Sequence, residues 1–112
     1  PDEQFISGLA MGAVGGIGGT YAVMPELFLK IYALTQAGDL AAARAIQNDV
    51  DRIIYKMCAA HGNLYAVMKA ILAKKGVDCG SVRKPLPALI DSDMPIVEEA
   101  AAMIDAAIAK YC

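Results

Sequence analysis

The chain has no tryptophan, one histidine and three cysteines in its 112 residues. The scarcity of these residues limits the classes of protein to which it can belong. Cys58, Cys79 and Cys112 are an odd number without close spacing, whereas a secreted disulfide framework uses paired cysteines. We therefore expect reduced thiols and a cytoplasmic location. Cys58 and His61 could share a helix face, but a zinc site needs three or four ligands, so no metal site is expected.

The chain also has no excess of basic residues. Ten basic and twelve acidic residues give a formal net charge of −2, and they are mixed along the chain. Nucleic-acid-binding domains usually show a basic footprint, so no nucleic-acid partner is expected. The first residues, PDEQF, are acidic where a signal peptide is basic, and no initiator Met precedes them. These features suggest that the chain start arises from processing, cleavage or engineering.

Hydrophobic residues are abundant, and alanine and glycine supply much of the excess. They make up 57% of the chain, against about 45–50% in typical soluble proteins. The length fits one domain. A chain of this size can bury roughly two-thirds of its unfolded surface, which is enough for a core.

A glycine-rich stretch near the start could be interpreted as a membrane-spanning helix. Residues 4–25 carry no charge, and as a helix they could span about 30 Å. Gly8, Gly12 and Gly16 have the four-residue spacing of packed membrane helices. However, the flanking charges are acidic, with no nearby lysine or arginine to orient a span. Each further glycine costs a helix about 1 kcal/mol. A membrane span is therefore not favoured, and no membrane partner is expected.

A phosphate-binding loop is a second interpretation of the same stretch, and its spacing argues against it. The letters GAVGGIGGT contain neither G-x-x-x-x-G-K-[ST] nor G-x-G-x-x-G. A third interpretation places a short helix over residues 4–11, then a buried strand around Val14–Thr20, then a helix opened by Pro25. This order is one unit of an alternating α/β protein. A lone strand cannot pair its backbone, so we expect the rest of the sheet to lie elsewhere.

Downstream, apolar residues recur at helical spacing. Gly38 and Gly62 are typical stop residues, and Asp39 and Asn63 are typical N-caps. The predicted helices cover residues 25–37, 40–60, 64–75 and from 91–93 to near the C-terminus.

Three motifs in order, PDE, GGIGGTY and VRKPLPAL, resemble the C-terminal part of N-acetylneuraminate lyases. These belong to the pyruvate-dependent class I aldolases that include dihydrodipicolinate synthase. The resemblance covers nearly the whole chain, and it implies a (β/α)8 barrel followed by extra helices, usually in a homotetramer. Such a barrel needs about 250 residues. The implied fold class is therefore a mainly α-helical C-terminal fragment of a TIM barrel. Residues 1–38 would be the end of the barrel, and residues 39–112 the helical extension.

The resemblance also implies a reaction, the cleavage of N-acetylneuraminate to pyruvate and N-acetylmannosamine without a cofactor. A lysine would form the Schiff base, and a tyrosine would relay protons. In the family these residues lie on strands six and five, outside this sequence, and none of the seven lysines falls in a matching motif. We therefore expect no catalytic residue here and no activity from this chain alone.

Four substrate contacts are implied by the resemblance. Asp2 and Glu3 match the acidic pair that binds sugar hydroxyls, and Ile17 matches an apolar position near the pyruvate end. Gly19 falls where many relatives have a serine that contacts the glycerol tail, so this contact would be lost or made by backbone. Val14 replaces an aspartate that is usual in the family, which makes this segment more apolar.

Other interpretations stay open. Without the resemblance, Asp2 and Glu3 are ordinary acidic residues at a helix N-terminus, and Ile17 is a core residue. The chain could also be another pyruvate-dependent aldolase of the superfamily, or a non-enzymatic helical module that self-associates through its glycine-rich segment. The expected partners are a sugar acid substrate and either further copies of the chain or the missing N-terminal part of the barrel.

Overall fold

Five α-helices and three short 3-10 helices follow one another in the computed structural model, which describes residues 1–112. The four downstream helices lie close to their predicted ranges, and the expected helix over residues 4–11 is shorter. The α-helices are α1 (Phe5–Ala10), α2 (Pro25–Gln36), α3 (Leu40–Cys58), α4 (Leu64–Lys74) and α5 (Met94–Tyr111). The 3-10 helices are η1 (Asp2–Gln4), η2 (Gly19–Ala22) and η3 (Asp91–Asp93).

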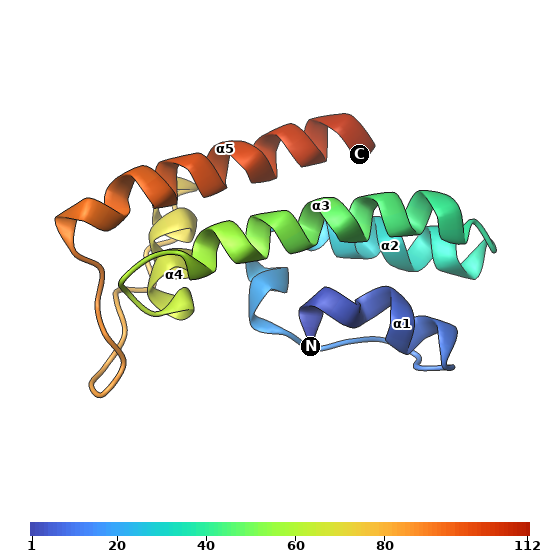
Figure 1. Ribbon diagram of the computed structural model, residues 1–112, viewed down its shortest axis with the longest axis horizontal. Helices are drawn as coiled ribbons and strands as arrows, with labels where there is room; N and C mark the ends of the chain where they lie inside the picture. Colours follow the sequence, from blue (N-terminus) through green and yellow to red (C-terminus); the bar gives the residue numbers. More distant parts are fainter.

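The longest helix, α3, lies at the centre of the arrangement. It runs antiparallel to α2 and to α5 and packs against both (Figure 1). The short helix α1 packs on α2 and α3, and α4 lies across one end of the molecule (Figure 1). The N-terminal residues of η1 contact both α3 and η2, and this contact brings the chain start to the glycine-rich segment.

Local sequence signals set several helix ends. The Asp39 side chain accepts a hydrogen bond from the Ala42 amide (3.0 Å) at the start of α3. Asn63 caps α4 in the same way by accepting the Tyr65 amide (2.9 Å). Gly38 has φ +82°, a left-handed conformation that favours glycine, and it follows the end of α2. These caps confirm the predicted boundaries between α2, α3 and α4.

The glycine-rich segment does not form the expected strand around Val14–Thr20. Residues 14–18 lie outside any regular element, and Gly18 is extended (φ −160°, ψ 155°). Their amides donate no backbone hydrogen bond, because no neighbouring strand is present to pair with them. The segment ends in the 3-10 helix η2. None of the helices combines the length and apolar content that crossing a membrane requires.

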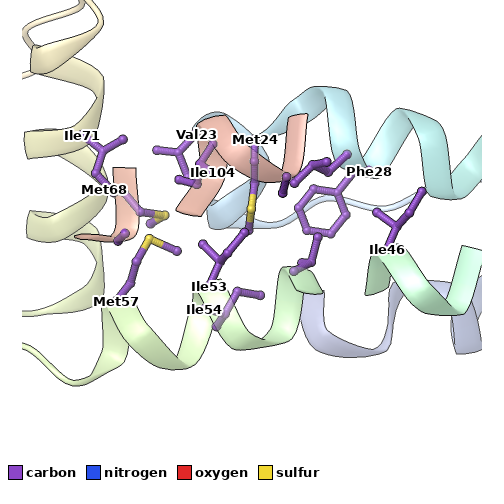
Figure 2. Close-up of a cluster of buried hydrophobic side chains, with 14 of the residues drawn as sticks. Val23, Met24, Phe28, Ile46, Ile53, Ile54, Met57, Met68, Ile71 and Ile104 are labelled. Carbon is purple, nitrogen blue, oxygen red and sulfur yellow. The ribbon is translucent and has the colours of Figure 1, made fainter. Parts of the chain in front are cut away.

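One hydrophobic core joins the two predicted parts of the chain. Met24, Leu27 and Ile31 from the first part pack with Ile53 and Ile104 from the second, and none of the five is more than 1% exposed. Figure 2 shows side chains from α2, α3, α4 and α5 converging on this core, including Ile53 and Ile104. Close packing of these side chains therefore fixes the helices relative to one another.

Candidate functional site

A surface hollow of about 370 Å³ lies where η1, the glycine-rich segment, α3 and α4 meet. Its size falls within the usual range of small-molecule sites, about 300–1,000 Å³. All four predicted substrate residues are at its wall, although they come from two separate segments. The twelve lining residues are Pro1, Asp2, Glu3, Ile17, Gly18, Gly19, Thr20, Ile54, Cys58, Leu64, Tyr65 and Met68.

Asp2 is held in place by Thr20. The Thr20 amide and hydroxyl donate to the same carboxylate oxygen, Oδ2, at 3.0 and 2.6 Å. Thr20 is only 2% exposed, so these bonds join the chain start to η2 away from bulk water. The Asp2 carboxylate also packs over Gly18, where an added Cβ would lie 1.9 Å from Oδ1. Gly18 is therefore required by the close approach of Asp2.

Gln47 supports this arrangement from α3. Its side-chain amide donates to the Asp2 carbonyl (3.1 Å) and to the Asp51 carboxylate (2.9 Å). Its side-chain oxygen accepts the Ile6 amide (3.1 Å) at the first turn of α1. Gln47 is 3% exposed and fully hydrogen-bonded, so it connects η1 and α1 to α3. The sequence analysis missed it.

Glu3 provides the free negative charge of the hollow. Its carboxylate makes no hydrogen bond within the chain, unlike that of Asp2. The pKa of the Cys58 thiol is raised above its usual value. Burial is the larger cause, and the charge of Glu3 is the smaller one. Burial and the charge of Glu3 also raise the pKa of Asp51, while the hydrogen bond from Gln47 opposes this shift. An unpaired carboxylate at a pocket wall can accept hydrogen bonds from hydroxyl groups of a ligand.

Ile17 and Gly19 lie on the opposite segment. The Ile17 side chain is fully exposed, so the interpretation of Ile17 as a core residue is wrong. This exposure arises because the unpaired segment passes over the surface rather than through a sheet. Gly19 faces Tyr65 and Met68, where an added Cβ would lie 2.8 Å from Tyr65 Cε1. No pattern in the sequence pointed to Tyr65, since α4 follows η2 by more than forty residues.

No lysine lines the hollow, and no three His, Cys, Asp or Glu side chains lie together as metal ligands. Lys56 and Lys74 are paired with glutamates of α5, at 3.0 and 2.6 Å. Lys110 pairs with Asp49 (3.0 Å). Lys69 and Lys75 donate to backbone carbonyls. The polar groups of the hollow are therefore carboxylates, hydroxyls, a thiol and backbone, which suit binding of a polyhydroxylated ligand.

The comparisons with a protein family and with individual proteins agree with one another. The family described as "Dihydrodipicolinate synthetase family" matches residues 1–104. An N-acetylneuraminate lyase of Mediterraneibacter gnavus is 58% identical over 112 residues, which cover 99% of this chain and 36% of that protein. An N-acetylneuraminate lyase of Rhizobium meliloti is 33% identical over 106 residues, which cover 92% of this chain and 34% of that protein.

A solved structure of wild-type sialic acid aldolase from Ruminococcus gnavus also matches. It superposes with a TM-score of 0.97 at 57% sequence identity and covers 100% of this chain and 38% of that chain. The chain therefore spans a little over a third of the length of these relatives. Together with the all-helical architecture, this match confirms the expected fold class, a mainly helical C-terminal part of a TIM-barrel enzyme.

The family match includes the residues of the hollow, the helices α2, α3 and α4, and α5 as far as Ile104. From this match and from the identity to N-acetylneuraminate lyases, we conclude that the chain belongs to the dihydrodipicolinate synthetase family.

Proposed function

We propose that this chain is part of a class I aldolase that cleaves N-acetylneuraminate to pyruvate and N-acetylmannosamine. The observation that carries the proposal is the 58% identity, over 99% of the chain, to a protein named N-acetylneuraminate lyase. Within the whole enzyme, residues 1–38 would complete the barrel and residues 39–112 would form the helical extension. The chain would work in the cytoplasm together with the remaining barrel, in a homo-oligomer.

The role of this chain in the reaction is to bind the sugar part of the substrate. Asp2, fixed by Thr20, and Glu3 would accept hydrogen bonds from the polyol, and Ile17 would contact the apolar part of the pyruvate end. The Schiff-base lysine, which acts as the electron sink for carbon–carbon cleavage, would come from outside these residues. The absence of lysine from the hollow supports this division of roles.

Borohydride trapping with pyruvate tests the proposal. The 112-residue chain alone should form no pyruvyl-lysine adduct and should show no lyase activity. After co-refolding with the N-terminal portion of the M. gnavus lyase, we expect N-acetylneuraminate cleavage, with the adduct on that N-terminal portion. A covalent adduct on this chain would contradict the assignment of the lysine. No activity after co-refolding would contradict the proposed function, and activity only with other aldehydes would favour another aldolase of the family.

A second function, self-association, is favoured by the apolar surface of the glycine-rich segment. Met11, Val14 and Ile17 are 89%, 92% and 104% exposed, and the backbone amides of residues 14–18 are unpaired. Exposed apolar patches and free strand edges tend to find partners. Light scattering should show oligomers that Val14→Ser and Ile17→Ser together reduce, whereas Leu40→Ser at the start of α3 should not. A monomer at high concentration would reject this function.

A further inference from the structure

Another hollow lies between α3 and α5, where the two helices run side by side (Figure 1). Its volume is about 210 Å³, below the range of about 300–1,000 Å³ that is usual for small-molecule sites. Its apolar lining residues are Ile53 from α3 and Met103, Ala106 and Ala107 from α5. Ile53 and Ala107 are buried and Met103 packs on the core, so the packing of the two helices fixes this lining. The α3/α5 hollow therefore suits a short apolar chain and is too small for a larger ligand.

Two cationic side chains line the α3/α5 hollow, and one carboxylate holds both. Asp49 Oδ1 pairs with the Arg52 guanidinium. Asp49 Oδ2 accepts hydrogen bonds from Lys110 Nζ (3.0 Å) and from the Tyr111 hydroxyl (2.6 Å). Asp49, Arg52 and Lys110 are all lining residues, so two positive charges against one negative charge leave the hollow with one positive charge in excess. A ligand with a single negative charge can neutralise this excess.

Most hydrogen-bond donors of the two cations are unused within the chain. A guanidinium has five N–H donors and an ammonium has three, whereas the Arg52 and Lys110 side chains donate only to Asp49. These side chains are 70% and 62% exposed, so their remaining donors can reach a ligand without breaking the bonds to Asp49. Because Asp49 restrains both cations, a second carboxylate would meet donors that are already positioned.

We propose that the α3/α5 hollow binds a small monocarboxylate with an unbranched apolar tail, such as the anion of a medium-chain fatty acid. The carboxylate accepts hydrogen bonds from Arg52 and Lys110. The tail lies on Ile53, Met103 and Ala106, which removes apolar surface of the ligand from water. A polyhydroxylated acid is disfavoured here, because its hydroxyl groups would lose water without finding partners on this lining. The site shares no lining residue with the hollow around Asp2 and takes a different class of ligand.

The test titrates sodium octanoate into the ¹⁵N-labelled 112-residue chain and follows the amide chemical shifts by NMR. We expect saturable shifts centred on residues 49–53 of α3 and 103–110 of α5. Acetate, which lacks the tail, should bind at least about 10-fold more weakly. Octanol, which lacks the charge, should bind about 5- to 10-fold more weakly, and Arg52→Gln combined with Lys110→Gln should weaken octanoate binding by the same factor. Arg44→Gln, at an exposed arginine of α3 outside the hollow, is the matched control and should bind octanoate as wild type does.

A second variant, Ala106→Leu, tests the shape of the hollow with both cations in place. Ala106 is exposed and leucine is a good helix former, so the fold should tolerate the change, while the larger side chain takes the space of the ligand tail. Octanoate binding should be lost, whereas Ala73→Leu, at an exposed position of α4 outside the hollow, should leave it unchanged.

Circular dichroism verifies that each variant folds, and the comparison of octanoate, octanol and acetate on the wild-type chain decides the matter if a variant does not. Four results would each overturn the inference: no saturable octanoate binding, shifts centred on the hollow around Asp2, octanol or acetate binding as tightly as octanoate, or unchanged binding in the charge variant or in Ala106→Leu. None of them bears on the proposed aldolase function, because the α3/α5 hollow has no part in it.

Discussion

Thr20 donates two hydrogen bonds, from its amide and its hydroxyl, to one carboxylate oxygen of Asp2. The two residues are eighteen positions apart, so these bonds close a loop that contains α1 and the whole unpaired segment. The other oxygen, Oδ1, has no hydrogen-bond partner in the chain. A structural role and the proposed binding role of Asp2 can therefore coexist, because they use different atoms.

Replacing Thr20 with valine should destabilise the fold. Valine has a similar shape but lacks the hydroxyl, so the Asp2 carboxylate loses the 2.6 Å bond. We expect the free energy of unfolding to fall by about 1–3 kcal/mol, measured by urea denaturation followed by circular dichroism. Thr35→Val is a control, since its hydroxyl bonds only the carbonyl of Ile31 within its own helix. Equal effects of the two substitutions would show that the bond to Asp2 stabilises the fold no more than a hydroxyl bond within one helix does.

Gln47→Ala should have a larger effect, because Gln47 serves three partners. The substitution leaves the Ile6 amide and the Asp2 carbonyl without their partner beside α3. We expect a loss of about 2–3 kcal/mol in the free energy of unfolding. Asn48→Ala, on the next and exposed position of α3, should change it by less than about 0.5 kcal/mol. A Gln47 variant as stable as the Asn48 variant would contradict the assigned role.

Acid should weaken the fold through Asp93. Hydrogen bonds from the amides of Ile90, His61 and Gly62, at 3.0, 2.7 and 3.0 Å, lower the pKa of this carboxyl. Because the folded-state pKa lies below the unfolded value of about 3.9, the stabilisation is full above that value. It is lost as the pH falls further, through the folded-state pKa. We expect Asp93→Asn to lower Tm at pH 7, and the difference from wild type to shrink progressively below about pH 4.

The proximity of Glu3 to Cys58 predicts that the Cys58 thiol is alkylated slowly. Burial and the charge of Glu3 raise the pKa of Cys58, so a smaller thiolate fraction is available at pH 8. Glu3→Gln removes the charge and should speed alkylation of Cys58 by iodoacetamide, read residue by residue by mass spectrometry. The rate at Cys79, in the loop after α4, should be unchanged and serves as the internal control. An unchanged Cys58 rate would place Glu3 away from the thiol.

Helices were predicted well because their signals are local. Asp39, Asn63 and Pro25 each act within one turn of the helix that they begin. The strand was predicted wrongly because a strand depends on partners that periodicity within one segment cannot reveal. The sequence pattern around Val14–Thr20 suits a buried strand, but without a paired neighbour the chain takes an irregular extended path.

The candidate site was predicted only in part, and the resemblance rather than periodicity pointed to its residues. The structure brings Asp2, Glu3, Ile17 and Gly19 to one hollow, and their role in substrate binding stays a prediction. Tyr65 was not found, because its contact with Gly19 joins elements far apart in sequence. Gln47 did leave a signal that was overlooked, as a polar residue at a helical position between buried Ala43 and Val50.

The unpaired backbone of residues 14–18 also affects how fast its amide hydrogens exchange with solvent deuterium. These five amides donate no hydrogen bond and should exchange at nearly the intrinsic rate, while those in the middle of α3 should be protected. Any molecule that pairs with this stretch, whether a second copy or the remainder of a barrel, would slow their exchange. The labelling pattern would thus report complex formation residue by residue, even before any enzymatic turnover could be measured.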